Sequence, residues 1–456
     1  MGPDRGGGRM GELSEGPSAR EAAMSLRSLL NRLLPGKPAP AAGTWGAPRP
    51  LDRGQVGRPQ IAMDDQGNAI AAWHHRGQDH EGVYICRFRA DQRAWDIVPR
   101  RLDSARTQAQ APEIAMNVRG EMAVVWQERE GDQSRVCARH MLGAAETWVP
   151  YPMTLQAGPG EVVSLHAAMD PAGNIHAVWC AGTRGAYRVY ASGYGAEGGA
   201  WDPQPTPLGA PSARAVYPQL AVNRAGQGLV VWSEENDGAG NRLVACHFEP
   251  AGRAWSDRPT EVARGRATYL RMALDDRGAA VVLWVGAGEG GVQNLHASHL
   301  DPRSLEWTPA PLLASGRAIH WPQVGLDAQG RAHALWRQEA AGAEKLFTRR
   351  YTGGRWEEAR TLLAEDLGGN QAHGLSVNAE GQALAIWSQQ LAGQASVCVR
   401  RFDGRTWSPR PLLLGAPGRK EIQTPGAVFA PGGHVAAIWR QGDARDGLIV
   451  SAVGEA

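Results

Sequence analysis

The sequence lacks the features of dedicated nucleic-acid and membrane proteins. Its formal net charge is only +2 over 456 residues, which argues against a dedicated nucleic-acid surface. No apolar run is long enough to span a membrane. Neither a phosphate loop, a cofactor-binding constellation nor a paired nucleophile and base is visible. These absences favour a non-catalytic protein without a cofactor.

Cysteine is also scarce and scattered. The five cysteines form no CxxC pair, and their odd number gives neither a disulfide framework nor a zinc site. They are Cys86, Cys137, Cys180, Cys246 and Cys398. We expect them to be free and buried.

What the sequence does have is an internal repeat. The stretch "DDQGNAIAAW" at residues 64–73 combines Asp or Asn, two residues, Gly, five residues and Trp. In eight copies a Gly lies six residues before a Trp, and successive tryptophans are 51 to 53 residues apart. The tryptophans are Trp73, Trp126, Trp179, Trp232, Trp284, Trp336, Trp387 and Trp439. Such a period indicates one structural unit used many times.

Each unit has the pattern of four strands. The Asp/Asn and Gly form a turn between two apolar runs, which is typical of a hairpin. A third run such as "VYICRF" follows, and a second Trp series opens a fourth strand. That series comprises Trp95, Trp148, Trp201, Trp255, Trp307, Trp356 and Trp407. Four antiparallel strands make one blade of a β-propeller.

The two ends of the sequence complement each other. The last unit lacks a fourth strand, and "TWGAPRPL" at residues 44–51 has the pattern of one. The sequence therefore predicts an all-β fold: an eight-bladed β-propeller of four-stranded antiparallel blades over residues 44–456, with its ring closed by the N-terminal outer strand. Residues 1–43 are Gly-rich and polar, and we expect a flexible tail with at most a short amphipathic helix.

The segment "RRFDGRTWSPRPLL" at residues 400–413 resembles the Asp-box, or BNR, repeat of sialidase-like propellers. Gly404, Thr406 and Trp407 match its spacing, Asp403 is one position late, and the Ser is absent. The resemblance implies three arginines around a substrate carboxylate, a Tyr–Glu nucleophile pair and an Asp acid. Arg58 and Arg271 match the first two arginines in position, and the remaining groups have no evident counterpart.

The candidate site is the end of the central channel where the first strands begin. Counting back from each Asp/Asn turn gives aromatic and polar residues at equivalent positions. The predicted ligand-binding residues are Arg58, Gln60, Tyr217, Gln219, Tyr269, Arg271, His320, Trp321 and Gln323. Flat rings with a few directional polar groups suit a carbohydrate or a peptide. The alternative is that the three aromatic residues only pack between neighbouring blades.

Metal binding is not expected at this site. His166, His320 and His373 lie near one channel mouth but on separate strands, and no HxH or HxxxH spacing joins them. The Asp/Asn turns each offer one side-chain oxygen, too few for calcium, and the side chain is explained as a cap of the hairpin.

We predict a non-catalytic module that recognises a glycan, peptide or protein partner at the channel mouth, and not a nucleic acid. The alternative is a sialidase-like glycoside hydrolase acting on an anionic sugar. Without a signal peptide the sequence favours a cytoplasmic location, with export as the alternative. The oligomeric state does not follow from the sequence.

Overall fold

The computed structural model describes residues 45–77, 81–104, 108–143, 147–183, 185–209, 214–235, 240–251, 253–365, 367, 372–418, 421–443 and 445–455. The tail and amphipathic helix expected over residues 1–43 lie outside this part of the chain, as does Thr44. The described residues belong to one compact unit, Gly43–Ala456. Among them, no helix is long and apolar enough to cross a membrane.

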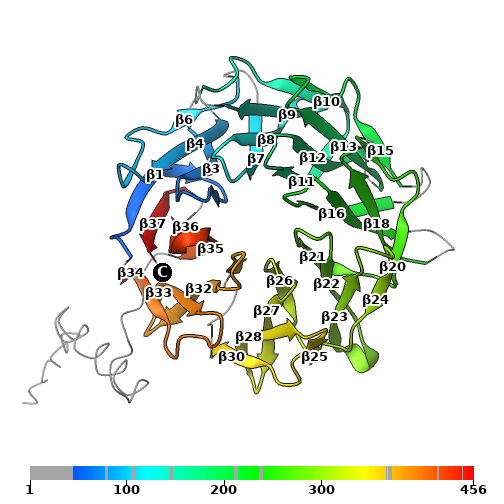
Figure 1. The fold of residues 1–456 in the computed structure, drawn as a ribbon. Helices are drawn as coiled ribbons and strands as arrows, with labels where there is room; N and C mark the ends of the chain where they lie inside the picture. Colours follow the sequence, from blue (N-terminus) through cyan, green and yellow to red (C-terminus); the bar gives the residue numbers. More distant parts are fainter. Residues whose placement is uncertain are drawn as a thin grey trace, which may run out of the picture. The chain divides into compact units, whose positions relative to one another are not determined.

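Antiparallel strands make up nearly all of the regular structure, and Figure 1 shows them arranged around a central axis. The innermost first strands are β2 (Gln60–Met63), β7 (Gln108–Met116), β11 (Glu161–Met169), β16 (Arg214–Val222), β21 (Thr268–Leu274), β26 (His320–Leu326), β31 (His373–Val377) and β35 (Ile422–Phe429). The second strands are β3 (Ala69–Arg76), β8 (Met122–Glu130), β12 (Ile175–Thr183), β17 (Gly228–Glu235), β22 (Ala280–Ala287), β27 (Ala332–Ala340), β32 (Ala383–Leu391) and β36 (His434–Gly442). This radial arrangement of antiparallel sheets is the β-propeller architecture that the repeat predicts.

The outer half of each sheet is built from a third strand and a divided fourth strand. The third strands are β4 (Glu81–Arg89), β9 (Gln133–Met141), β13 (Ala186–Gly195), β18 (Arg242–Glu249), β23 (Gln293–Leu300), β28 (Ala343–Thr352), β33 (Gln394–Phe402) and β37 (Gly447–Glu455). Short outer pieces that contain the second Trp series are β5 (Ala94–Trp95), β14 (Ala200–Trp201), β19 (Ala254–Trp255), β24 (Trp307–Pro309) and β29 (Arg355–Trp356). The remaining outer strands are β1 (Arg49–Val56), β6 (Arg100–Arg101), β10 (Met153–Pro159), β15 (Thr206–Leu208), β20 (Thr260–Arg264), β25 (Ala314–Gly316), β30 (Thr361–Ala364) and β34 (Leu412–Gly418). Two 3-10 turns, η1 (Glu289–Gly291) and η2 (Pro431–Gly433), complete the regular structure.

The fourth strand is less regular than the sequence predicts. In one sheet Trp201 pairs with Tyr194, but pairing resumes only at Thr206, which lies opposite Ala191. Residues between the two pieces include Pro203 and Pro205. Because proline has no N–H to donate to a neighbouring strand, the ladder is interrupted there.

The Asp/Asn–Gly turns between first and second strands form as predicted. The Asp64 Oδ1 atom accepts hydrogen bonds from the main-chain N–H groups of Gln66 (2.9 Å) and Asn68 (2.8 Å). Gly67 has φ +85°, a conformation that favours glycine. The capping role of the aspartate is confirmed, and these turns define one face of the ring, which we call the turn face. The opposite face, where first strands begin and second strands end, is the entry face.

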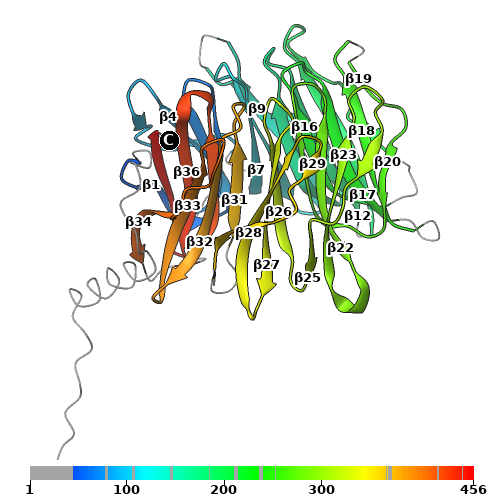
Figure 2. The ribbon, with the colours of Figure 1, turned by 60° about the horizontal axis from the view of Figure 1, so that its bottom comes forward.

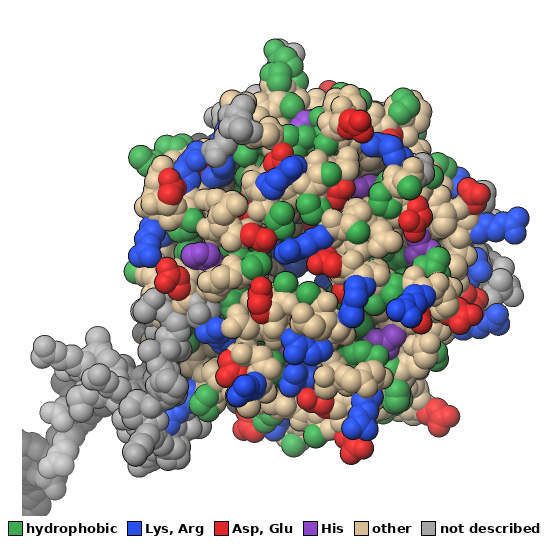
Figure 3. All heavy atoms as spheres, viewed as in Figure 1, with side chains coloured by type: hydrophobic (Ala, Val, Ile, Leu, Met, Phe, Trp, Pro, Cys, Tyr) green, Lys and Arg blue, Asp and Glu red, His purple; other side chains and the backbone are tan. Residues whose placement is uncertain are grey.

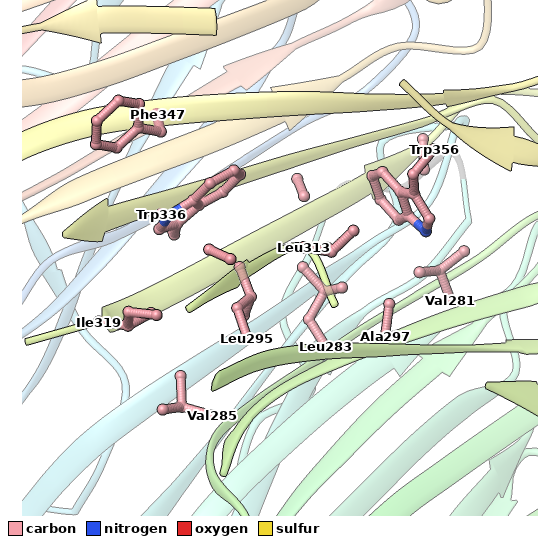
Figure 4. Packing of buried hydrophobic residues seen from close by; sticks show 13 residues of the cluster. Val281, Leu283, Val285, Leu295, Ala297, Leu313, Ile319, Trp336, Phe347 and Trp356 are labelled. Atoms are coloured by element: carbon pink, nitrogen blue, oxygen red, sulfur yellow. The ribbon is translucent and has the colours of Figure 1, made fainter. Parts of the chain in front are cut away.

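The hydrophobic core lies between adjacent sheets. In the cluster of Figure 4, Leu283 and Leu295 of one sheet pack against Trp336 and Trp356 of the next. All eight tryptophans of the first series are buried. All five cysteines are free and buried, as predicted, and burial raises the pKa of the Cys180 thiol to about 12. The repeated tryptophans therefore stabilise contacts between sheets.

The N-terminal and C-terminal strands share one sheet. Strand β1 pairs with β37 over residues 49–54 and then with β3 through Gln55 and Val56. The result is a nine-stranded sheet of order β35-β36-β37-β1-β3-β4-β5, in which β2 also pairs with β3 and β6 also pairs with β4. Strand β2 contacts both β7 and β35. Figure 1 shows the first strands innermost around the central axis, and Figure 2 shows the same strands after a 60° turn.

Candidate functional site in the central channel

The first strands bulge where they approach the entry face. In these strands the pairing register shifts, for example between Val216 and Gln219 and between His320 and Gln323. At each shift one non-glycine residue has a positive φ, between 47° and 57°: Ala111, Ser164, Tyr217, Tyr269, Trp321 and Thr424. An aromatic residue in the left-handed backbone conformation is strained. Bulges of this kind are typical next to functional sites because they redirect side chains.

Below the bulges, polar side chains of successive first strands touch one another in the channel. Gln60 Nε2 donates to Glu113 Oε1 at 2.5 Å, and Glu113 Oε2 lies 3.9 Å from His166 Nδ1. Gln219 Nε2 lies 3.2 Å from His166 Nε2 and donates to the carbonyl of Pro218 at 2.8 Å. We call Gln60, Glu113, His166, Gln219 and Arg271 the polar layer.

The electrostatics of the polar layer centre on Glu113. Burial raises the pKa of the Glu113 carboxyl to about 7. The hydrogen bond from Gln60 and the charges of Arg58 and Arg271 oppose this shift by favouring the ionised form. Burial, with Arg271 and Arg58, lowers the pKa of His166 to about 4, so this imidazole is neutral at neutral pH. The layer thus holds a carboxyl that titrates near neutrality beside an uncharged histidine.

The positive charges of both predicted arginines, Arg58 and Arg271, favour the ionised form of the Glu113 carboxyl. Burial and the charge of Arg58 lower the pKa of Arg271 from its ordinary value, while Glu113 opposes that shift. Arg271 donates to the carbonyl of Leu270 at 2.8 Å. Within the described part of the chain, neither arginine has a carboxylate within 4.0 Å. The channel therefore carries two guanidinium charges that no neighbouring carboxylate pairs.

The three predicted aromatic residues do not form one cluster. Tyr269 lies edge-on to Trp321, with ring centroids 6.2 Å apart, and His320 is 5.8 Å from Tyr269. Tyr217 is 53% exposed and has no ring contact among the described residues. Tyr269 and Trp321 thus pack against each other, whereas the Tyr217 ring is exposed.

Arginine covers the inner side of Trp321. The Arg337 guanidinium carbon lies 5.0 Å from the centre of the Trp321 ring and Arg337 forms an ion pair with Glu344. Burial, followed by the charge of Arg337, lowers the pKa of His320. Gln323 is half-buried opposite Leu335, and its side chain has no hydrogen-bond partner within the described ranges.

Polar residues near the ends of four second strands have a structural role. In four sheets the buried indole N–H donates to the Glu or Gln two residues later. These pairs are Trp126–Glu128 (2.9 Å), Trp232–Glu234 (3.2 Å), Trp336–Gln338 (3.2 Å) and Trp387–Gln389 (3.1 Å). A buried indole requires an acceptor, so these side chains satisfy the core.

Glu113 and His166 are the residues that the sequence-based site omitted. Both stand four residues before an Asp/Asn turn, the same position as Gln60 and Gln219, so the spacing alone could have included them. Their interaction depends on contacts between strands 53 residues apart.

On the turn face, Arg224 reaches residues of two other repeats. Its side chain lies 3.5 Å from Asp65 and 3.7 Å from Asp276, and its main-chain N–H donates to Asp276 Oδ1 at 3.1 Å. Figure 3 shows charged side chains around a small central opening on the face that it presents. The Arg224 contacts therefore join the turns of three different repeats at this end of the channel.

No group of three or more His, Cys, Asp or Glu side chains within the described ranges could hold a metal ion. His373 is buried beside the channel, and burial lowers its pKa to about 3.

No protein-family model and no curated protein matches this sequence. Solved structures with similar folds include an ulvan lyase of a polysaccharide lyase family, with 11% identity, a TM-score of 0.49, and coverage of 89% of this chain and 95% of that one. A Hadza microbial sialidase has 12% identity and a TM-score of 0.41, covering 90% and 94% of the two chains. The β-propeller domain of the Trilobed protease from Pyrococcus furiosus has 8% identity and a TM-score of 0.46, covering 80% and 99%.

Proposed function

We propose that the entry face of the channel binds an anionic saccharide. The observation that carries this proposal is the convergence of Arg58 and Arg271 on Glu113 without a carboxylate partner of their own. Guanidinium groups match carboxylate and sulfate oxygens in geometry and charge. The exposed ring of Tyr217 supplies an apolar face for a sugar, and Gln219 supplies a directional polar group.

The test is a glycan array with the Arg58→Ala/Arg271→Ala double variant. Loss of two charge-assisted contacts, each about 1.5–3 kcal/mol, predicts a fall in affinity of a hundredfold or more for acidic glycans. The matched control is Arg93→Ala/Arg264→Ala, which removes the same charge from exposed ion pairs. Equal binding by the double variant and its control would exclude the two channel arginines as the ligand contacts.

A second candidate is a sialidase-like glycoside hydrolase, and one observation favours it. Because its pKa lies near 7, Glu113 can carry a proton at neutral pH and so act as a general acid. A tyrosine–carboxylate pair exists, with Tyr187 Oη donating to Glu161 Oε2 at 2.7 Å, but it belongs to β13 and β11 and not to the strands near Arg58 or Arg271. Sialoside hydrolysis that disappears in Glu113→Gln would favour the enzyme, and binding without turnover would favour the lectin-like module.

The finer architecture forms part of the proposal. We infer eight blades, with the nine-stranded sheet divided at β1, and a ring that closes where β1 joins β37. The contact of β2 with β35 supports this arrangement. Deleting residues before Gly57 would expose the edge of β37, and we expect aggregation on gel filtration. A monomeric, equally stable product would argue against closure through β1.

A further inference from the structure

A second cavity lies where the two ends of the propeller meet. The end of β1 runs beside β3, with Gln55 opposite Arg76 and the Gly57 N–H donating to the His74 carbonyl at 2.7 Å. Facing it are β35 and β36, and together these strands enclose a cleft of about 390 Å³ that we call the seam cleft. It is lined by Gln55, Val56, Gly57, Arg58, His74, Arg76, Gln423, Thr424 and Arg440.

The lining of the seam cleft is rich in hydrogen-bond donors and positive charge. Three of the lining residues are arginines and none is an Asp or Glu. Arg76 forms an ion pair with Glu81 at 3.1 Å. The Glu81 carboxylate also lies 2.9 Å from His74 Nε2. The lining itself therefore carries more positive than negative charge.

Arg440 contributes charge without being available to a ligand. Its guanidinium donates to the Val56 carbonyl at 2.7 Å, to Gln423 Oε1 at 2.6 Å and to the Asp443 carbonyl. These acceptors are neutral, so they fix the side chain and leave its charge uncancelled. Because Arg440 occupies the Gln423 oxygen, the NH₂ end of that amide remains for another acceptor.

Thr424 adds an unsatisfied donor. It stands at the bulge of β35 with φ +47°, and its hydroxyl is buried without a hydrogen-bond partner. A buried hydroxyl without a partner costs about 1–3 kcal/mol. In a cleft that has several donors and no carboxylate, an anionic oxygen is the group that would satisfy it.

Arg58 connects the seam cleft to the channel site, because it lines the cleft and its charge also acts on Glu113 in the polar layer.

We infer that the seam cleft is a second anion subsite, so that the ligand is an oligosaccharide with at least two anionic groups, carboxylate or sulfate. This inference rests on the proposed function. A saccharide fits better than a nucleic acid because the chain is nearly neutral overall and Tyr217 is the exposed ring at the entry face. Linking two subsites converts the second contact into an intramolecular one, which strengthens binding without any change at the first.

The experiment is titration calorimetry with galacturonic acid and with its tetramer. For the unmodified protein we expect the tetramer to bind at least about tenfold more tightly than the monosaccharide. Thr424→Val removes only the hydroxyl and keeps the branched shape, and Arg76→Gln removes the charge and shortens the side chain. Each should lower tetramer affinity about three- to tenfold and leave monosaccharide affinity unchanged, whereas Arg58→Gln should lower both.

Each remaining outcome overturns the inference in a distinguishable way. Equal affinity for monosaccharide and tetramer, or a parallel loss of both in Thr424→Val and Arg76→Gln, would exclude a second subsite while the channel site stands. Tighter binding of a thymidine tetranucleotide than of the galacturonate tetramer would replace the saccharide with a nucleic acid. No binding of either saccharide would remove the proposed function and this inference together. The control is Arg93→Gln, an exposed arginine paired with Glu455.

Discussion

Gln60 Nε2 and Glu113 Oε1 form a 2.5 Å hydrogen bond between the first strands of two consecutive repeats. The bond fixes one carboxylate oxygen, and the other oxygen lies 3.9 Å from His166. The Glu113 carboxyl group therefore lies between Gln60 of the first repeat and His166 of the third repeat. The protonation state of Glu113 is thus central to the site.

Replacing Glu113 with Gln should raise stability at alkaline pH. The folded-state pKa of Glu113 is raised to about 7, so folding favours the protonated form, and stability is lost as pH rises from the ordinary value of 4.5 through 7. Glu113→Gln removes this pH-dependent loss of stability and keeps the shape of the side chain. Urea unfolding should show a gain on the order of 1 kcal/mol at pH 8 and little at pH 5. Identical gains at both pH values would contradict the assigned titration.

Truncating Tyr217 and Trp321 should have opposite consequences. Tyr217 is exposed, so Tyr217→Ala should leave the melting temperature nearly unchanged and weaken binding of acidic glycans. Trp321 is half-buried and packs against Tyr269 and the Arg337 guanidinium, so Trp321→Ala should lower the free energy of unfolding by about 1–3 kcal/mol. Calorimetry and glycan binding on the same samples separate the two roles; a large destabilisation by Tyr217→Ala would show that it is core.

Replacing Glu128 should lower the stability of the fold without changing ligand binding. Its carboxylate accepts the Trp126 indole N–H at 2.9 Å and lies 3.9 Å from Arg135. Glu128→Ala leaves the indole without an acceptor, at a cost of about 1–3 kcal/mol. Glu128→Gln keeps the acceptor oxygen and serves as the control. We expect lower urea midpoints for the alanine variant with unchanged glycan affinity, and altered glycan affinity in the glutamine variant would place Glu128 in the binding site.

Acid should destabilise the fold through buried histidines. His333 packs against Phe402 with ring centroids 4.6 Å apart, and burial, then Arg350 and Arg331, lowers its pKa to about 3. Between about pH 6.5 and 3 the unfolded chain binds the extra proton, so stability falls as pH falls through this window. His333→Leu should flatten the curve by at most about 1.4 kcal/mol per pH unit. Parallel stability curves for the two proteins would exclude His333 as a contributor.

The repeat and its hairpins could be predicted from the sequence more fully than the candidate site. The Asp64 turn was predictable because Asx caps and glycine turns are local. The bulges were not, because a left-handed Tyr217 or Trp321 runs against the preference of those residues. The Glu113–His166 contact could not be foreseen in detail either, because it depends on how neighbouring sheets pack side by side.

The shared sheet of β1 and β37 has a consequence for biosynthesis. As the ribosome extends the chain, β1 emerges early and has no β37 partner until the last repeat has been made. The seam cleft unites residues 55–58 with residues 423–440, so it does not exist on a nascent or C-terminally clipped chain. The proposed anion subsite would therefore form only in molecules that retain both strands, and a truncated product would lack it.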